Sequence, residues 1–171
     1  MSEARDEDRV VGPLRQAREP LHAGLRQLQV AAESLDGAEQ RVAAAALESA
    51  LGYLERQLIP ILHAEDFTMF PALDGVLGAT GACQVMVAQH RAIEAMAHDL
   101  RQVVEAARTD EDAAAYARYL LPLLHGLYAL IRAHLESEDD VYLALLDEHL
   151  SESQVNVITE NLERIASART V

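Results

Sequence analysis

The 171-residue chain has no tryptophan and a single cysteine, Cys83. One cysteine excludes an internal disulfide framework, so we expect a protein of the reducing cytoplasm. No apolar run approaches the roughly 18–20 residues that a membrane-spanning helix needs. The charged segment 1–9 also lacks the apolar stretch of a signal peptide. The sequence therefore predicts neither a membrane protein nor a secreted, disulfide-stabilised one.

Basic residues are also few, with 14 Lys and Arg against 28 Asp and Glu, which leaves a net charge of −14. A surplus of this sign argues against nucleic acid and anionic membrane surfaces as partners. It suits a protein that attracts cations, although solvated surface accounts for most of the charge.

Half of the residues are hydrophobic, and alanine and leucine dominate among them. This composition favours helices over sheets. The length suits one domain with a core of its own. We expect residues 1–12 to form a disordered polar tail and residues 13–171 to form a single helical bundle domain.

Apolar residues recur at helical spacing over four long segments, which are separated by glycine, proline and capping signals. The predicted helices are Pro13–Asp36, about 38–70 with a bend at Pro60 and an end at Pro71, about 82–108, and about 111–149 with an interruption at Pro122. Residues 74–81, rich in glycine, predict a loop. Ser151 and Gln154 form a capping signal for a short fifth helix. The predicted fold is all-α: an up-down-up-down four-helix bundle with a short fifth C-terminal helix.

Two of these helices carry a histidine followed four residues later by a glutamate. The pairs are His134 with Glu138 and His90 with Glu94. Residues four apart share one helix face, and the first pair follows an apolar stripe that continues to Val141 and Leu145. Because buried titratable groups cost several kcal/mol each unless they are paired, the two pairs predict a metal site between two helices.

Single histidines carry much less weight, because one on an apolar face is more often a hydrogen-bonded core or boundary residue. We assign His98, His125 and His149 to this class. His125 precedes His134 by nine residues, which places it about 180° around the helix. The two His-Glu pairs have the same alternative interpretation, as exposed pairs at helix edges.

Four motifs together resemble the hemerythrin family, the HHE cation-binding domains, over roughly residues 14–167. The motifs are an acidic pair followed by an aromatic residue and proline at 65–71, His90–Glu94, Gly126–Leu143 around His134, and Leu21–Leu28 at the entry to the first helix. The resemblance implies a four-helix bundle around a non-haem iron site, with a di-iron centre expected.

The resemblance also implies a ligand set. Its candidates are the inward-facing histidines and glutamates: His22, Glu65, His90, Glu94, His134 and Glu138. Three imidazoles and three carboxylates suit iron, with manganese or zinc less favoured. By this resemblance the chain is a hemerythrin-like protein that binds or senses O2, NO or peroxide. Redox reactivity at the metal is a further possibility. We expect a binding or sensing protein rather than an enzyme.

Two positions depart from the family pattern. Ile61 stands where the family usually carries a histidine, four residues before the glutamate of helix two. In helix one, aligning the leucines with the family pattern can place the expected histidine at Arg18. His63 lies about 200° around the helix from Glu65, so we expect it to point elsewhere. A di-iron site, a single-ion site and an empty site all stay open, as does a tyrosine ligand from Tyr53, Tyr119 or Tyr128. The alternative function is a metal-depleted bundle with a structural or interaction role.

Overall fold

The computed structural model describes residues 10–36, 39–109 and 113–169. No strand occurs among these residues, which form helices joined by short connections. In chain order the elements are α1 (Gly12–Ser34), α2 (Gln40–Tyr53), the π-helical turn η1 (Leu54–Leu58), α3 (Ile59–Phe67), α4 (Met69–Leu77), α5 (Gln84–Thr109), the 3₁₀ turn η2 (Ala113–Tyr116), α6 (Ala117–Ser137), the π-helical turn η3 (Glu138–Tyr142), α7 (Leu143–His149) and α8 (Glu152–Arg169).

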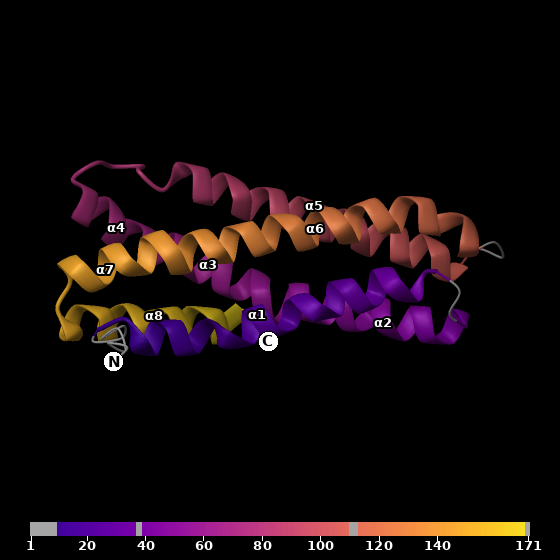
Figure 1. Ribbon diagram of the computed structural model, residues 1–171, viewed down its shortest axis with the longest axis horizontal. Helices are drawn as coiled ribbons and strands as arrows, with labels where there is room; N and C mark the ends of the chain where they lie inside the picture. The colour runs from indigo at the N-terminus through magenta and orange to yellow at the C-terminus, as the bar shows by residue number, and fades with distance from the viewer. Residues whose placement is uncertain (1–9, 37–38, 110–112, 170–171) are drawn as a thin grey trace, which may run out of the picture.

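These elements form four long rods that run alternately up and down the long axis (Figure 1). The rods are α1, α2 to α4, α5, and α6 to α7. Helix α1 packs against α2 and α6, and α5 packs against α6. The predicted helical bundle is therefore confirmed. None of the helices in the described ranges is long and apolar enough to cross a membrane.

The first helix begins slightly earlier than the sequence predicts. The backbone N–H groups of Val10 and Val11 donate to the Asp147 carboxylate, over 3.0 and 3.3 Å. A carboxylate at a helix N-terminus is favourable because the first N–H groups of a helix lack partners within it. Val11 is also buried, so the chain is structured from Val10 onward. Residues 1–9 of the predicted tail lie outside the described part of the chain.

The second rod does not end at Pro71 as predicted. Helix α3 ends at Phe67, Thr68 departs from helical geometry with φ −125° and ψ −68°, and α4 starts at Met69. Pro71 is thus in the first turn of α4, where its missing N–H group costs nothing because no partner within the helix exists for it. Pro60 is the second residue of α3, directly after the π-helical turn η1, so the rod departs from regular α-helical hydrogen bonding just before this proline.

The loop after the second rod is shorter than the predicted 74–81. Helix α4 continues to Leu77 and is closed by Gly78, whose φ of 64° is left-handed. A residue without Cβ adopts this conformation at little cost. The proposed helix start at Thr109–Asp112 falls largely on residues outside the description. Pro20 and Pro122 lie inside α1 and α6, so neither proline interrupts its helix.

A π-helical turn also shifts the core-facing stripe in the fourth rod. In η3 the N–H group of Leu143 bonds to the carbonyl of Glu138, five residues back. This extra residue moves Leu143 and Leu146 into the core and leaves Val141 about half exposed. The predicted stripe is therefore wrong at Val141, because it assumed an uninterrupted α-helix, whereas Leu145 is half-buried and packs against the core.

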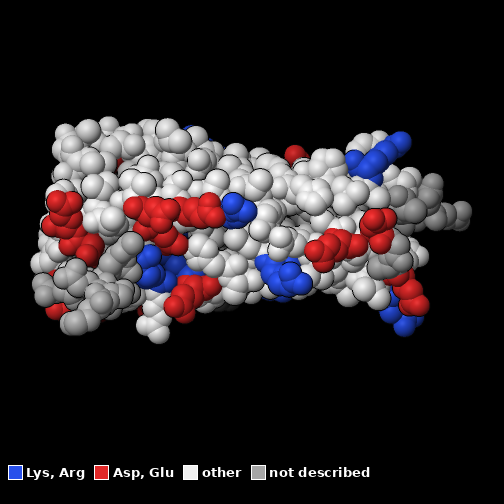
Figure 2. Space-filling model, viewed as in Figure 1, with Lys and Arg blue, Asp and Glu red and all other residues white. Residues whose placement is uncertain are grey.

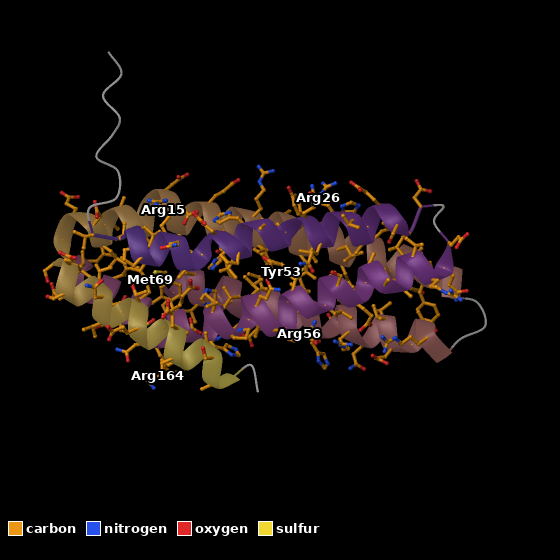
Figure 3. The ribbon with its side chains drawn as sticks, turned by 90° about the horizontal axis from the view of Figure 1, so that it is seen from below. Arg15, Arg26, Tyr53, Arg56, Met69 and Arg164 are labelled. Carbon is orange, nitrogen blue, oxygen red and sulfur yellow. The ribbon has the colours of Figure 1, made fainter. Side chains whose placement is uncertain are left out.

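The fifth helix is longer than predicted. Helix α8 has 18 residues and lies against α3, with further contacts to α1. Its start matches the capping signal, because both the N–H and the hydroxyl of Ser151 donate to the Gln154 side-chain oxygen at 2.9 Å. Figure 3 shows α8 as the yellow helix that crosses the second rod obliquely.

The buried apolar residues fall into two separate clusters. The first core joins α1, α2, α5 and α6, and includes Leu28, Leu51, Leu100 and Leu127. The second core joins the start of α1 with α4, α7 and α8, and includes Leu14, Leu73, Leu146 and Leu162. All four rods contribute residues to both cores. The residues between the two cores therefore lie at the middle of the bundle.

Candidate metal centre

A layer of charged and polar side chains separates the two cores. Each of the four rods contributes polar residues to this layer. In each rod, these residues lie about one turn from a residue of the second core on one side and from a residue of the first core on the other. The sequences, from second core to first, are Leu14, Arg18 and Leu21 on α1; Met69, Glu65 and Leu62 on α4 and α3; Met86, His90 and Ile93 on α5; and Leu143, Glu138, His134 and Ile131 on α7 to α6.

Four potential ligands converge in this layer: Glu65, His90, His134 and Glu138. One ligand atom from each lies within 4.8 Å of those from the others, and all four residues are fully buried. The Nε2 atoms of His90 and His134 are 3.0 Å apart. Glu65 Oε2 lies 3.6 Å from His90 Nε2, and Glu138 Oε2 lies 3.4 Å from His134 Nε2.

The other ring nitrogen of each histidine is held from outside the cluster. His90 Nδ1 donates to the Asp66 carboxylate at 2.9 Å, and His134 Nδ1 donates to the Gln89 amide oxygen at 2.9 Å. Each Nδ1 thereby carries a proton, so Nε2 is the nitrogen of each ring that can bind a metal ion. The Phe70 ring stacks on His90 at 5.1 Å between centroids, which fixes the orientation of that imidazole further.

Arg18 closes the layer from α1. Its guanidinium donates one hydrogen bond to Glu65 Oε1 and another to Glu138 Oε2. Glu65 Oε2 and Glu138 Oε1 have no hydrogen-bond partner although they are buried. Each glutamate therefore has one oxygen on Arg18 and one unpartnered oxygen.

Burial and charge set the protonation of these groups. Burial, then His90 and Arg18, lower the pKa of His134 to about 2, so its ring is neutral at physiological pH. Burial alone would lower the pKa of Arg18, but Glu138, Glu65 and Asp139 outweigh it and raise the pKa above its ordinary value. Burial and the neighbouring Glu65 raise the pKa of Glu138, against the opposing effect of Arg18. The raised pKa of Glu138 reflects its burial beside a second carboxylate, which the single guanidinium of Arg18 only partly offsets.

His22 and Glu94 are not brought into this cluster. The core-facing stripe of α5 steps from His90 to Ile93 and Ala97, so Glu94 is displaced toward the helix edge. There its carboxylate accepts a 2.7 Å hydrogen bond from the partly exposed His63. The stripe of α1 likewise runs through Arg18 and Leu21, which leaves His22 at the edge.

His22 instead forms a 2.7 Å pair with Asp139, and its side chain is 39% exposed. Asp139 also lies 3.6 Å from Arg18 Nε. Arg18, the residue that sequence reasoning did not include among the cluster's members, had a visible signal: it stands in line with Leu14, Leu21 and Leu25 on the buried face of α1.

The remaining candidates lie away from the layer. Tyr53 donates its hydroxyl to the Leu21 carbonyl at 2.8 Å inside the first core, and Tyr119 is about half exposed. Cys83 is buried in the second core, where burial, with Asp74 and Glu138, raises the pKa of its thiol. A protonated, enclosed thiol is inert.

The three histidines assigned to ordinary surface roles, His98, His125 and His149, are exposed.

Comparison with protein families gives a match to the hemerythrin HHE cation binding domain over residues 14–146. The chain belongs to this family. Comparisons with curated proteins and with solved structures gave no significant match. The match covers the four rods up to α7, whereas α8 follows it.

The cluster fits the cation that the family description names. Ligand atoms about 2.1 Å from one ion lie roughly 3–4 Å from one another. The two Nε2 atoms are 3.0 Å apart and Glu65 Oε2 is 3.6 Å from His90 Nε2, distances of this size. A cation between the imidazoles would also give the unpartnered oxygens of Glu65 and Glu138 a partner. Glu65, His90, His134 and Glu138 are therefore the residues that could hold a metal ion.

Proposed function

We propose that this hemerythrin-family protein binds iron at Glu65, His90, His134 and Glu138, and uses it to bind or sense O2, NO or peroxide. The supporting observation is the pair of buried imidazoles whose Nε2 atoms face each other at 3.0 Å beside two unpartnered carboxylate oxygens. Buried polar atoms without partners are costly, and one cation satisfies all four donors.

The ligand chemistry favours iron over the alternatives. Two imidazoles with carboxylates and open positions are typical of non-haem iron that reacts with O2. Manganese prefers oxygen ligands more strongly, and structural zinc usually has a closed tetrahedral site. Iron in such a setting supplies redox chemistry toward O2, NO and peroxide.

The chain's own residues prepare the site for this role. Asp66 and Gln89 hold the two rings by their Nδ1 atoms, so both Nε2 atoms are oriented toward the place of the ion. The two cores on either side exclude bulk water from the layer. A ligand set held this way suits a binding or sensing protein, and the cytoplasmic location expected from the single cysteine stays a prediction.

One observation favours the rival function, a metal-free bundle with a structural or interaction role. Arg18 already neutralises part of the charge of Glu65 and Glu138 by direct pairing. On this view the guanidinium replaces the metal altogether. The facing imidazoles argue against it, because the hydrogen bonds of Arg18 go to the glutamates and to neither Nε2 atom.

Metal analysis of freshly purified protein, with an ultraviolet–visible spectrum in air and after NO addition, separates the two functions. We expect iron in the wild type, a near-ultraviolet ligand-to-iron band and a spectral change with NO. His134→Ala should remove most of the metal because it deletes a donor and leaves charged neighbours unpaired. The exposed His125 and His149 supply the matched controls, and alanine at either should leave metal content unchanged.

Two results would contradict this function. The first is less than about 0.2 metal ions per chain after iron-replete expression, a threshold for real occupancy. The second is a metal content that falls in the His125→Ala control but not in His134→Ala.

A further inference from the structure

We infer that this centre holds one metal ion, and that the Arg18 guanidinium occupies the place of a second cation. The inference rests on the proposed metal-binding function and specifies the number of ions. Sequence reasoning leaves two ions, one ion and none as alternatives, whereas the contacts of Arg18 distinguish among them.

The division of carboxylate oxygens is the first argument. A carboxylate can bridge two cations with one oxygen on each. Both Glu65 and Glu138 have one oxygen on Arg18 and one oxygen free. Arg18 thus takes the place of one of the two cations that the glutamates could bridge. The free oxygens are available to one further cation, the metal ion.

The size of the cluster is the second argument. Two-metal sites place their ions about 3.5–4 Å apart, so their ligand atoms spread over roughly 7 Å or more once metal–ligand bonds of about 2 Å are added. Here the four donor atoms lie within 4.8 Å of one another. This span is far below 7 Å and close to the limit of about 4.2 Å between two ligand atoms that share one ion at about 2.1 Å.

Charge is the third argument. The carboxylates in or beside the layer are Glu65, Glu138, Asp66 and Asp139, four negative charges in total. One divalent ion and Arg18 bring three positive charges to these four. Two divalent ions and Arg18 would bring five, with the guanidinium held against an ion inside a buried layer. Like charges at such distances repel strongly in a low-dielectric interior.

Arg18 cannot easily leave to admit a second ion. Its side chain is 1% exposed and is bound at both ends of the guanidinium to buried carboxylates. Moving it out would leave two ionised glutamates unpaired, which is strongly unfavourable. The guanidinium is therefore a permanent member of the centre.

Anaerobic titration of the apoprotein with ferrous iron tests the inference, with bound metal measured by elemental analysis and by electron paramagnetic resonance after oxidation. We expect saturation at one ion per chain and the signal of an isolated high-spin ferric ion. Saturation at two ions with a silent, coupled pair would overturn the inference and leave the iron-binding function standing. Failure to bind any metal would instead overturn the proposed function.

Three substitutions test the role of Arg18 itself. Arg18→Lys keeps the charge and should stay at one ion. Arg18→His removes the permanent charge and adds a donor, and should take up more than one ion per chain. Arg18→Gln keeps a hydrogen-bond donor without the charge, and should bind the first ferrous ion at least about tenfold more tightly because a nearby positive charge is lost.

The substitutions remain informative if one of them misfolds, because the wild-type stoichiometry and the Gln variant do not depend on the His variant. One ion per chain in Arg18→His, or unchanged affinity in Arg18→Gln, would overturn the claim that Arg18 holds the second cation's place.

Discussion

Single residues decide what this bundle can bind. Arg18 and Ile61 both replace expected histidines, and both flank Glu65: Arg18 pairs with it and Ile61 precedes it by one turn of α3. Ile61 is half-buried and packs against both cores. A donor at position 61 would thus enter the edge of the polar layer.

We predict that Ile61→His strengthens iron binding. The new imidazole would add a ligand near Glu65, so the variant should lose iron to a chelator more slowly than the wild type. Without iron, the variant should be less stable by about 1–3 kcal/mol, because the imidazole is buried without a partner. Melting curves with and without iron measure both effects, which have opposite signs.

His63→Ala is the matched control on the same helix. His63 pairs with Glu94 at the partly exposed edge, so iron content and chelator kinetics should not change. The opposite pattern, with iron lost from His63→Ala and a lower melting temperature for Ile61→His in iron, would make His63 the ligand.

The structure brings four of the six proposed ligand residues together in one layer and leaves His22 and Glu94 at its edge. Glu65, His90, His134 and Glu138 stand on core-facing stripes that step by three and four residues. His22 and Glu94 are each one residue beyond such a stripe, a displacement of about 100° that motif spacing alone does not resolve. A family motif gives the spacing between its histidine and its glutamate. Which of the two faces the core depends on where the apolar stripe of the whole helix lies.

At the scale of elements, two π-helical turns and one glycine contact set how the helices meet. The turn η3 begins at Glu138 itself, and η1 precedes the helix that carries Glu65. Such turns often occur at functional sites. They could not be predicted from periodicity, because an inserted residue shifts the stripe without leaving a local compositional signal.

Helices α1 and α2 meet at Gly24, against which the Tyr53 ring packs. Figure 3 shows Tyr53 between the two helices. A Cβ at position 24 would come within 2.1 Å of two ring atoms of Tyr53. Tyr53 cannot move freely, because it is fully buried and its hydroxyl is bonded to Leu21. The close approach of the two helices therefore requires glycine here.

We predict that Gly24→Ala destabilises the protein by about 1–3 kcal/mol or more, the usual cost of overpacking a filled core. Gly75→Ala is the control, since Gly75 is exposed inside α4 with nothing within 4 Å of its added Cβ. That substitution should stabilise α4 by up to about 1 kcal/mol. Urea denaturation of both variants compares them directly, and equal midpoints would mean that the α1–α2 contact is looser than it is in this structure.

At the scale of the whole molecule, the fold was predictable and the division of its core was not. Composition and spacing indicate a helical bundle because each rod has one apolar stripe. Figure 2 shows acidic side chains outnumbering basic ones on the face that it views, in keeping with the net charge of −14. The separation into two cores appears only when the polar positions of all four rods align at one level.

Helix α8 completes the second core, although the family match ends before it. Its buried residues, Val155, Ile158, Leu162 and Ala166, join the cluster that flanks the polar layer. Helix α8 also lies against α3, which carries Glu65. A loosely docked α8 would admit water beside the metal ligands, so we expect its packing to affect metal retention.

We predict that Leu162→Ala lowers the free energy of unfolding by about 2–5 kcal/mol, as for other fully buried leucines. Iron should also be lost faster to a chelator, because opening of the second core exposes the layer. Val157→Ala is the control on the same helix: Val157 is 56% exposed, and its loss should change stability by less than about 0.5 kcal/mol. If Leu162→Ala melts lower but holds iron as long as the control does, the first core and the rods alone protect the metal centre, and α8 serves only stability.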